Sequence, residues 1–352
     1  MTIIDYNANV YVPSGKGGQR MVTIRTIAER CGLSVAAVSR ALNGRSGISE
    51  EKAAQVRRIA REMGYQPNEA ARTLKTNRSN LIGVLYNNLL AHEFFSQVLE
   101  GMRSEAERAG YEILFLNIHS GDYYERARQY HCAGVIIAQG DFDMDSVRTL
   151  ACSDIPTVGI ELDSDCCPSI FSNNAGAMEA LVRHVHALGH ERIAFIHGEM
   201  GLITRERIEG FRRGCISCNI PVREEYLRPC RFRSPEQAGE ITRELLSLPQ
   251  PPTCILYPDD ICYLGGAHAA EMMGLSIPRD VSCVGFDGVS LTRALKPQLT
   301  SYVQDGLTMG RTAAQEVIKA IEAPGTSAAR RILVGGYIQT GETVRDLKGD
   351  RE

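Results

Sequence analysis

Arg40 carries a planar guanidinium group that can donate several hydrogen bonds in one plane. It lies about one helical turn after Val35 and Ala36, the first two residues of a short apolar helical pattern. A guanidinium can donate two hydrogen bonds to a guanine edge, whereas Val35 and Ala36 can only pack against thymine methyl groups. We therefore predict that base readout comes from the start of this helix.

Short polar side chains nearby suit contacts with a DNA backbone. Hydroxyl and amide groups commonly bind phosphate oxygens and so fix the register of a protein on the duplex. The residues of this kind are Thr23, Ser34, Ser39 and Asn43. Ser34 also stands where an N-cap oxygen would satisfy the first amides of the helix, and the two roles are compatible.

Three helical patterns must position these side chains. Residues 24–30 and 35–42 are joined by the tight turn 31–34, and a third helix is expected between Ser49 and Met63. Apolar residues recur at helical spacing and can fill one small core: Ile27, Ala28, Val38, Leu42, Val56, Ile59 and Ala60. This arrangement is typical of a helix-turn-helix, whose second helix lies in the DNA major groove.

The distribution of charge supports the same interpretation. Residues 21–80 contain eleven Lys or Arg against five Glu, a net charge of about +6, although the whole chain carries −3. Residues 81–352 must therefore carry about −10. A basic module joined to an acidic domain is typical of a nucleic-acid-binding regulator. A solvated helical face would give a similar basic run, but it would not explain the helix-turn-helix spacing.

From Leu81 onward, short apolar runs alternate with amphipathic helical stretches. The runs are 82–86, 111–116, 134–138, 157–160, 193–196, 254–257 and 281–286, and the helical stretches include 95–109, 175–188, 205–218, 235–246 and 261–273. Repeated βα units predict parallel sheets covered by helices on both faces. About 270 residues is generous for one sheet, so two Rossmann-like lobes are expected. Ligands of such sheets bind beyond the carboxyl ends of the strands.

The chain resembles the lactose/galactose-repressor (LacI/GalR) family of bacterial transcription regulators. The matching motifs are T-I-x-x-I-A from Thr23, G-x-S-x-x-x-V-S-R-x-L-N from Gly32 and G-Y-x-P-N-x-x-A-R-x-L from Gly64. Landmarks such as Arg207-x-x-Gly210-Phe211 and Val284-Gly285-Phe286-Asp287 extend the similarity. The resemblance implies a small all-α helix-turn-helix headpiece followed by an α/β, two-lobed core like that of periplasmic binding proteins.

This resemblance divides the chain into five segments. Residues 1–20 have no counterpart and are expected to form a disordered leader, which a later start at Met21 would remove. Residues 21–66 form the DNA-binding domain, 67–80 the hinge helix and linker, 81–344 the effector-binding and dimerisation core, and 345–352 a charged tail without heptads.

The segment that begins at Pro67 resembles the family's hinge helix. In the family, paired hinge helices enter the minor groove, and a leucine wedges a central base step open at a cost that contacts on the bent duplex offset. Leu74 falls at the wedge position, Asn68 can cap the helix, and Ala71 allows two helices to approach closely. The alternative is a plain linker with Leu74 packed on the core.

Two residues match family positions that bind a small effector. Arg207 begins a helix after a strand and matches an arginine that binds polar groups, and Asp287 matches an acidic ligand at a strand end. Six further candidates follow from the same resemblance: Asn87, His92, Phe94, Glu161, Asp259 and Gln304. For these six, a role beside the site is as plausible as direct contact. An arginine opposed by carboxylates suits a polyhydroxylated or anionic molecule.

The sequence also departs from the family. Residues 119–132 are shorter than usual, and Thr340-Gly341-Glu342-Thr343 replaces a common Arg-x-Ser-Thr run, which makes the pairing of the last strand harder to predict. The added carboxylates of Asp259 and Glu342 would favour neutral polyols over acids.

Eleven cysteines without a secretory signal indicate a reducing cytoplasm, where most thiols serve as small buried hydrophobic groups. Cys215-x-x-Cys218 has no second pair at zinc-site spacing, and His186 and His190 lack the acidic partner of a metal-binding helix. We expect neither a metal nor a cofactor. No apolar run approaches the roughly 20 residues that a membrane span needs.

Two other classes of protein fit less well. A solute-binding protein would share the two-lobed core but has no use for a helix-turn-helix. An enzyme is not supported, because there is no GxGxxG opening the first βα unit, no GxSxG and no P-loop. We therefore predict a cytoplasmic homodimeric repressor of double-stranded operator DNA, controlled by a sugar-like effector. A purine, a nucleoside or a protein partner remains an alternative signal.

Overall fold

The computed structural model describes residues 22–42, 46–65, 79–85, 92–116, 122–138, 144–325 and 328–349. The predicted leader 1–20 and the predicted site residues Asn43, Asn68, Ala71, Leu74 and Asn87 lie outside these ranges. The chain divides into two compact units, residues 1–78 and 79–352. The second unit thus begins two residues before the core that the sequence predicted.

The described part of the first unit folds into three short helices around one core. They are α1 (Ile24–Cys31), α2 (Val35–Leu42) and α3 (Glu50–Glu62). A capping box starts α1, because the Thr23 side chain accepts from the Thr26 amide and the Thr26 hydroxyl accepts from the Thr23 amide. The core contains Ile27, Ala28, Val38, Ala41, Ala53, Val56 and Ala60, with Leu42 and Ile59 partly buried against it. All seven residues predicted for this core therefore contribute to it.

The described part of the second unit contains two six-stranded sheets. Lobe 1 is built on β11 (Arg331–Val334), β5 (Ser169–Ser172), β4 (Thr157–Ile160), β3 (Gly134–Ile137), β1 (Leu81–Leu85) and β2 (Glu112–Leu116), in spatial order. Lobe 2 is built on β12 (Tyr337–Gln339), β10 (Thr300–Val303), β9 (Ser282–Asp287), β8 (Cys254–Leu256), β6 (Ile193–His197) and β7 (Leu227–Pro229). Neighbouring strands are parallel except for β10 with β12. The predicted α/β, two-lobed fold is confirmed.

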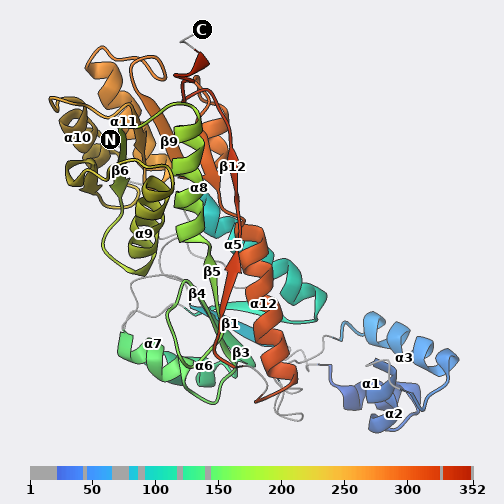
Figure 1. Ribbon diagram of the computed structural model, residues 1–352. Coiled ribbons are helices and arrows are strands. Elements are labelled where there is room, and N and C mark those ends of the chain that lie inside the picture. Colours follow the sequence, from blue (N-terminus) through green and yellow to red (C-terminus); the bar gives the residue numbers. More distant parts are fainter. Residues whose placement is uncertain are drawn as a thin grey trace, which may run out of the picture. The chain divides into compact units, whose positions relative to one another are not determined.

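Helices cover both faces of each sheet (Figure 1), which is why the central strands are largely apolar. In lobe 1, α5 (Glu93–Arg108) and α12 (Gly306–Glu322) pack on one face, and α6 (Tyr123–Gln129) and α7 (Met144–Ala151) on the other. In lobe 2, α8 (Asn174–Ala187) and α9 (Leu202–Ser217) face α10 (Pro235–Leu246) and α11 (Asp260–Met272) across the sheet. None of the helices described is long and apolar enough to cross a membrane.

Glycine allows the backbones of α5 and α12 to approach closely. A Cβ added at Gly310 would lie 1.8 Å from the carbonyl oxygen of Val98, so only a residue without a side chain fits at this crossing. The contact joins two helices that are about 200 residues apart in sequence.

The strand order repeats between the lobes and fixes where a ligand can bind. Lobe 1 contains β2-β1-β3-β4-β5, and lobe 2 contains β7-β6-β8-β9-β10, so each is a doubly wound sheet. The order reverses between β1 and β3 and between β6 and β8, and ligands bind beyond the carboxyl ends of strands at such reversals. In the described part of the chain, the loops after β6 and β8 are therefore an expected site.

The chain passes between the lobes three times. The connections run from β5 into α8, from β10 into α12, and from β11 into β12. The strands β5, β10, β11 and β12 and the helix α12 were not among the apolar runs and helices picked out from the sequence.

Two residues of the predicted tail, Arg345 and Leu347, form hydrogen bonds with lobe 2. The Arg345 amide donates to the Ser282 hydroxyl at 3.0 Å, and the Leu347 amide donates to the Leu188 carbonyl at 2.8 Å. These contacts extend lobe 2 beyond residue 344, where the sequence predicted that the core ends.

Candidate functional site

The start of α2 is an accessible surface of the first unit. The Ser34 hydroxyl accepts a hydrogen bond from the Ala37 amide at 3.2 Å, so the predicted cap is present. Val35, Ala36 and Arg40 are exposed. Because the cap fixes where the helix begins, the three positions predicted for base readout are held on a rigid element and open to solvent.

The predicted phosphate contacts already have local roles. Thr23 and Ser34 are exposed hydroxyls that accept hydrogen bonds at the starts of α1 and α2, and Ser39 is half-buried. A hydroxyl that accepts one hydrogen bond retains its proton for donation. Thr23 and Ser34 can therefore cap a helix and still donate to a phosphate oxygen.

Arg207 lies at the centre of the polar cluster in the second unit. Its side chain is buried, with 5% exposure, although it starts from the second turn of α9. The Nε atom donates to Oδ1 of Asn174 at 2.9 Å, and an Nη atom donates to the carbonyl of Pro258 at 2.8 Å. The guanidinium carbon lies 3.6 Å from the ring centre of Phe286 and 5.8 Å from that of Phe232. These contacts hold the guanidinium plane in one orientation.

Asp287 ends β9 in a left-handed backbone conformation, with φ of 99°. One carboxylate oxygen accepts a hydrogen bond from the side-chain amide of Gln304 at 2.6 Å, and the other lies 3.3 Å from Nε2 of His92. Burial raises the pKa of Asp287 well above its ordinary value, while the Arg207 guanidinium acts to lower it. The predicted residues Arg207, Asp287, Gln304 and His92 thus form one electrostatic cluster.

His92 reaches this cluster from lobe 1, where it precedes α5. The side chain is 7% exposed, and burial lowers its pKa, which favours the neutral ring. A neutral ring that donates from Nε2 to Asp287 has its acceptor lone pair on Nδ1. Among the described residues, this Nδ1 atom is buried without a hydrogen-bond partner. It is therefore available to accept from a hydroxyl or amine of a ligand.

Glu161 follows β4 with φ of 55° and brings a second carboxylate toward the guanidinium of Arg207. One of its oxygens accepts from the Ser172 amide at 2.9 Å, and the other lies 3.5 Å from the amide nitrogen of Asn174. Burial raises the pKa of Glu161 to about 7. Asn174 consequently bridges Glu161 and Arg207, which come from different lobes.

Asp259 has a positioning role. One oxygen caps α11 by accepting from the Cys262 amide, and the other accepts from the Arg233 amide, both at 2.8 Å. Its carboxylate thereby holds the loop that carries Phe232. These two contacts are those that the structure gives the Asp259 carboxylate. The contact with an effector, which the sequence predicted, stays a prediction.

The sequence reasoning missed Asp260, although it adjoins a predicted residue. This fully buried carboxylate accepts from the Ser301 hydroxyl at 2.6 Å and from the Val289 amide at 2.7 Å, and burial raises its pKa to about 7. It fixes the loop that directly follows Asp287, the last residue of β9. Its place beside Asp259, two residues after Pro258 and four after the end of β8, was the available signal.

Three more residues at the site were not predicted. Asn174 is 1% exposed, and the Phe232 ring lies so close to Gly198 that a Cβ there would be 2.1 Å from it. Thr204 lies one turn before Arg207, and its hydroxyl is buried without a hydrogen-bond partner in the described part of the chain. Asn174 follows the end of β5 by two residues, and Thr204 lies on the same helix as Arg207, so both had a local signal. Only the tertiary structure brings Phe232 to Arg207.

Two expectations about individual side chains fit the structure poorly. Phe94 packs in the core of lobe 1, edge-on to Phe95 at 5.0 Å between ring centres, so a packing role explains it. The Glu342 carboxylate contacts the Gln298 amide and lies 3.6 Å from the Lys296 amine. It is therefore occupied at the surface of lobe 2, and it does not add charge around Arg207.

Two parts of the chain match known protein families. Residues 23–68 match the family described as "Bacterial regulatory proteins, lacI family". Residues 182–344 match "Periplasmic binding protein-like domain". The first match covers the helix-turn-helix, and the second covers Arg207 and Asp287.

Similar proteins cover nearly the whole chain. The probable HTH-type transcriptional repressor ExuR of Bacillus subtilis is 28% identical over 93% of this chain and 99% of its own length. The HTH-type transcriptional repressor CytR of Escherichia coli is 28% identical over 93% of this chain and 98% of its own. The solved structure of the Lac repressor dimer bound to operator and the anti-inducer ONPF has a TM-score of 0.79 and 25% identity, over 92% of this chain and 99% of that one.

Proposed function

The chain belongs to the lacI family of bacterial regulatory proteins and is a DNA-binding transcriptional repressor, and we propose that a small molecule bound around Arg207 controls its affinity for operator DNA. One observation carries the proposal. A buried guanidinium adjoins two carboxylates, while the Nδ1 atom of His92 and the hydroxyl of Thr204 lack partners among the described residues. A buried polar atom without a partner costs about 1–3 kcal/mol, which a ligand would recover.

The chemistry of the cluster favours a neutral molecule rich in hydroxyl groups. Arg207 donates, the Nδ1 atom of His92 accepts, and the Thr204 hydroxyl can do both. The carboxyl groups of Glu161 and Asp287 already adjoin the single guanidinium, so an anion would gain little from it. A sugar or sugar derivative fits this set.

Besides the contact between Asn174 and Glu161, three further polar contacts among the described residues join the lobes and give such a ligand a means of control. His92 of lobe 1 meets Asp287 of lobe 2, and Glu93 of lobe 1 accepts from the amide and hydroxyl of Ser290 at 2.7 and 2.9 Å. An ion pair between Arg331 and Glu206 forms the third contact. A ligand that strengthens or replaces these contacts changes lobe closure, and a coupling of about 1–3 kcal/mol suffices to alter DNA affinity.

On DNA, we propose a homodimer in which each helix-turn-helix reads one half of a pseudo-palindromic operator. The solved Lac repressor dimer bound to its operator supports this arrangement. Val35, Ala36 and Arg40 would contact bases, and Thr23, Ser34, Ser39 and Asn43 phosphates. The hinge residues Asn68, Ala71 and Leu74 would enter the minor groove.

A purine or nucleoside is the second candidate for the effector. The specific observation in its favour is the Phe232 ring beside the Arg207 guanidinium, since a flat base can stack on an aromatic face.

A thermal-shift screen distinguishes these candidates. The full chain is tested with glucose, glucuronate, glucose 6-phosphate, mannitol, guanine and adenosine, alongside Arg207→Ala and the matched control Arg205→Ala, an exposed arginine of the same helix. A ligand at about 100 times its Kd stabilises the wild type by about 2.7 kcal/mol, a shift of several degrees. We expect that shift to persist in Arg205→Ala and to vanish in Arg207→Ala. His92→Ala provides a second test should Arg207→Ala fail to fold, and an equal shift in both site variants would contradict the proposal.

A further inference from the structure

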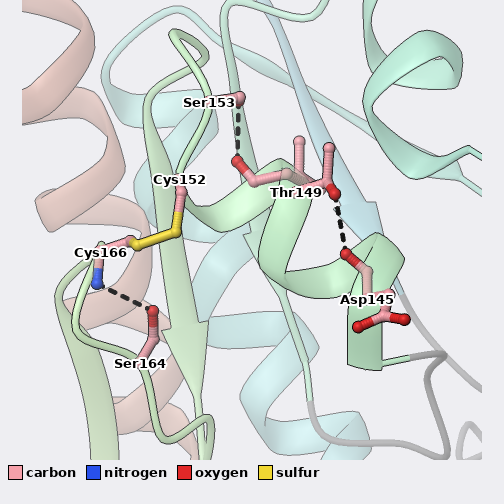
Figure 2. The surroundings of a disulfide bond; sticks show 7 residues. Asp145, Thr149, Cys152, Ser153, Ser164 and Cys166 are labelled. Atoms are coloured by element: carbon pink, nitrogen blue, oxygen red, sulfur yellow. Dashed lines mark hydrogen bonds between the residues drawn. A yellow bond between two sulfur atoms is a disulfide. The ribbon is translucent and has the colours of Figure 1, made fainter.

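A disulfide joins Cys152, directly after α7, to Cys166, in the loop between β4 and β5 (Figure 2). The two Cα atoms are 4.9 Å apart, a normal separation for a disulfide. Both residues are exposed, whereas the nine other cysteines are buried or half-buried. The sequence analysis expected reduced, mostly buried thiols, and this exposed pair is the exception.

The neighbouring Cys167 does not compete for this bond. Its side chain is 3% exposed and packs in the core between the lobe 1 sheet and the helices α6 and α7. Burial raises the pKa of this thiol, which keeps it in the unreactive protonated form. The reactive sulfur atoms at this surface are therefore those of Cys152 and Cys166.

The loop that contains Cys166 connects the disulfide to the effector site. The strands β4 and β5 are parallel neighbours, so residues 161–168 must return from the carboxyl end of one to the amino end of the other. We call this segment the return loop. It begins at Glu161, in the cluster around Arg207, and the disulfide holds it near its other end. The bond therefore closes a ring that contains β4 and Glu161.

We propose that Cys152 and Cys166 form a reversible thiol–disulfide modification site through which the redox state of the cell acts on the effector site. A repressor works on DNA, in a compartment where disulfides are rare and, when present, are usually transient or redox-sensing. Exposure makes both sulfur atoms accessible to exchange. The coupling to Glu161 rests on the proposed function, whereas the modification itself does not.

The oxidant is a low-molecular-weight disulfide such as glutathione disulfide. One cysteine loses its proton to water and attacks a sulfur atom of the oxidant, which forms a mixed disulfide and releases one glutathione thiolate. The second cysteine then attacks the mixed disulfide at the protein sulfur, forms the Cys152–Cys166 bond and releases the second glutathione thiolate. Two electrons pass from the protein thiols to the oxidant, and the released thiolates take up the two protons. Reduction is the reverse exchange.

The redox state of Cys152 and Cys166 determines whether the return loop is linked covalently to α7. In the oxidised protein, the loop is anchored covalently to the end of α7, and Glu161 accepts from the Ser172 amide at 2.9 Å. After reduction, the return loop loses this covalent link to α7. It keeps the core packing of Cys167, the hydrogen bond from the Glu161 amide to the Ile170 carbonyl at 2.8 Å, and the hydrogen bond from the Cys166 amide to the Ser164 hydroxyl at 3.1 Å. Loss of the covalent link therefore loosens Glu161 and lowers its contribution to ligand binding.

The first experiment tests the modification. The full chain is equilibrated in glutathione buffers of increasing oxidised fraction, and differential alkylation with mass spectrometry measures the fraction of Cys152–Cys166 disulfide. We expect that fraction to rise from about a tenth to about nine tenths across the series and to fall again on reversal. Cys152→Ser and Cys166→Ser should abolish it, and Cys218→Ser should not. A pair that stays reduced in every buffer, or a disulfide that glutathione cannot reduce in the folded protein, would overturn the proposal.

The second experiment tests the coupling without requiring a known effector. Amide hydrogen exchange is measured for the Ser172 amide and the return loop in the oxidised and reduced protein. We expect exchange at Ser172 to be about tenfold faster after reduction, and this change to be absent in Cys152→Ser. Equal exchange in both redox states would refute the link to Glu161. Failure of the ligand screen, by contrast, would leave both measurements unaffected, so the two proposals can fail separately.

Discussion

Replacement of Asn174 by alanine tests the architecture of the site more directly than replacement of any charged group. The Oδ1 atom of Asn174 is the acceptor for Nε of Arg207, and its amide nitrogen donates to the carbonyl of Ser172 at 3.3 Å. Both side chains are at least 95% buried, so water cannot replace the lost acceptor without a rearrangement. Asn174→Ala therefore leaves a buried guanidinium nitrogen unsatisfied.

The expected cost follows from these two bonds. A hydrogen bond to a charged group contributes about 1.5–3 kcal/mol and a neutral one about 1 kcal/mol, so Asn174→Ala should destabilise the protein by about 3 kcal/mol. In a domain of this size, 1 kcal/mol shifts the Tm by about 2–4 °C, which gives a decrease of about 6–12 °C. Differential scanning calorimetry and urea unfolding measure this change.

The neighbouring asparagine is the matched control. The Asn173 side chain caps α8 by accepting from the Gly176 amide at 3.1 Å, and loss of such a cap costs about 1 kcal/mol. Asn173→Ala should consequently lower the Tm by about 2–4 °C. In an Arg207→Met background, the effect of Asn174→Ala should shrink, because the guanidinium is gone. Equal Tm values for the two asparagine variants, or no shrinkage in that background, would refute the reasoning.

Three further predictions concern other parts of the chain. Arg40→Ala should weaken binding to the selected operator by about 1–3 kcal/mol and relax selectivity at one base pair, which fluorescence anisotropy measures. An equal loss of affinity for random DNA would exclude base readout by Arg40. Burial raises the pKa of Glu161 from 4.5 to about 7, so the folded state binds a proton that the unfolded state has released. The contribution of Glu161 to stability is therefore complete below pH 4.5 and is lost as the pH rises to about 7. Glu161→Gln should remove this pH dependence from the stability measured by urea unfolding between these two pH values, and an unchanged pH slope would contradict the prediction. Thr343→Val should lower the free energy of unfolding by about 1–3 kcal/mol, because the Thr300 amide loses its buried acceptor. The control Thr340→Val, at an exposed position, should change it by less than about 0.5 kcal/mol, and similar Tm values for the two variants would count against the hydrogen bond between Thr300 and Thr343.

The helices and inner strands could be predicted because their signals are local. The caps at Thr23, Ser34 and Ser49 and the apolar spacing between them define all three headpiece helices to within a residue or two. The runs that became β1, β3, β4, β6 and β9 are largely apolar because helices cover both faces of each sheet. Such signals do not depend on which elements later become neighbours.

The strands near the crossings could not be predicted in the same way. The strand β12 has three residues, none fully buried, and it pairs in the antiparallel direction with β10. Its place depends on long-range contacts, such as the buried Thr343 hydroxyl, which donates to the Cys283 carbonyl at 2.7 Å. No periodicity within three residues can indicate that partner.

The effector site shows the same difference between residues with a local sequence signal and residues placed by tertiary contacts. Arg207 and Asp287 could be singled out from motifs at the starts and ends of elements. Asn174 acquires its role only when α8 packs beside α9, and Phe232 only when its loop folds over Gly198. The partners of a buried charge are set by tertiary contacts, so the sequence indicates the charge and leaves its partners open.

The three passages of the chain between the lobes determine when each lobe can be completed during synthesis. The core of lobe 1 includes Met309, Ala313 and Val317 of α12, which follow the last residue of β5 by more than 130 positions. At about 5–20 residues per second, a ribosome delivers α12 roughly 7–27 s after β5. During that interval, one face of the nascent first sheet, with Ile136 and Val158, has no α12 to cover it. Most of lobe 2 emerges in the meantime, before lobe 1 is complete, and the nascent chain presents an apolar surface that a chaperone can bind.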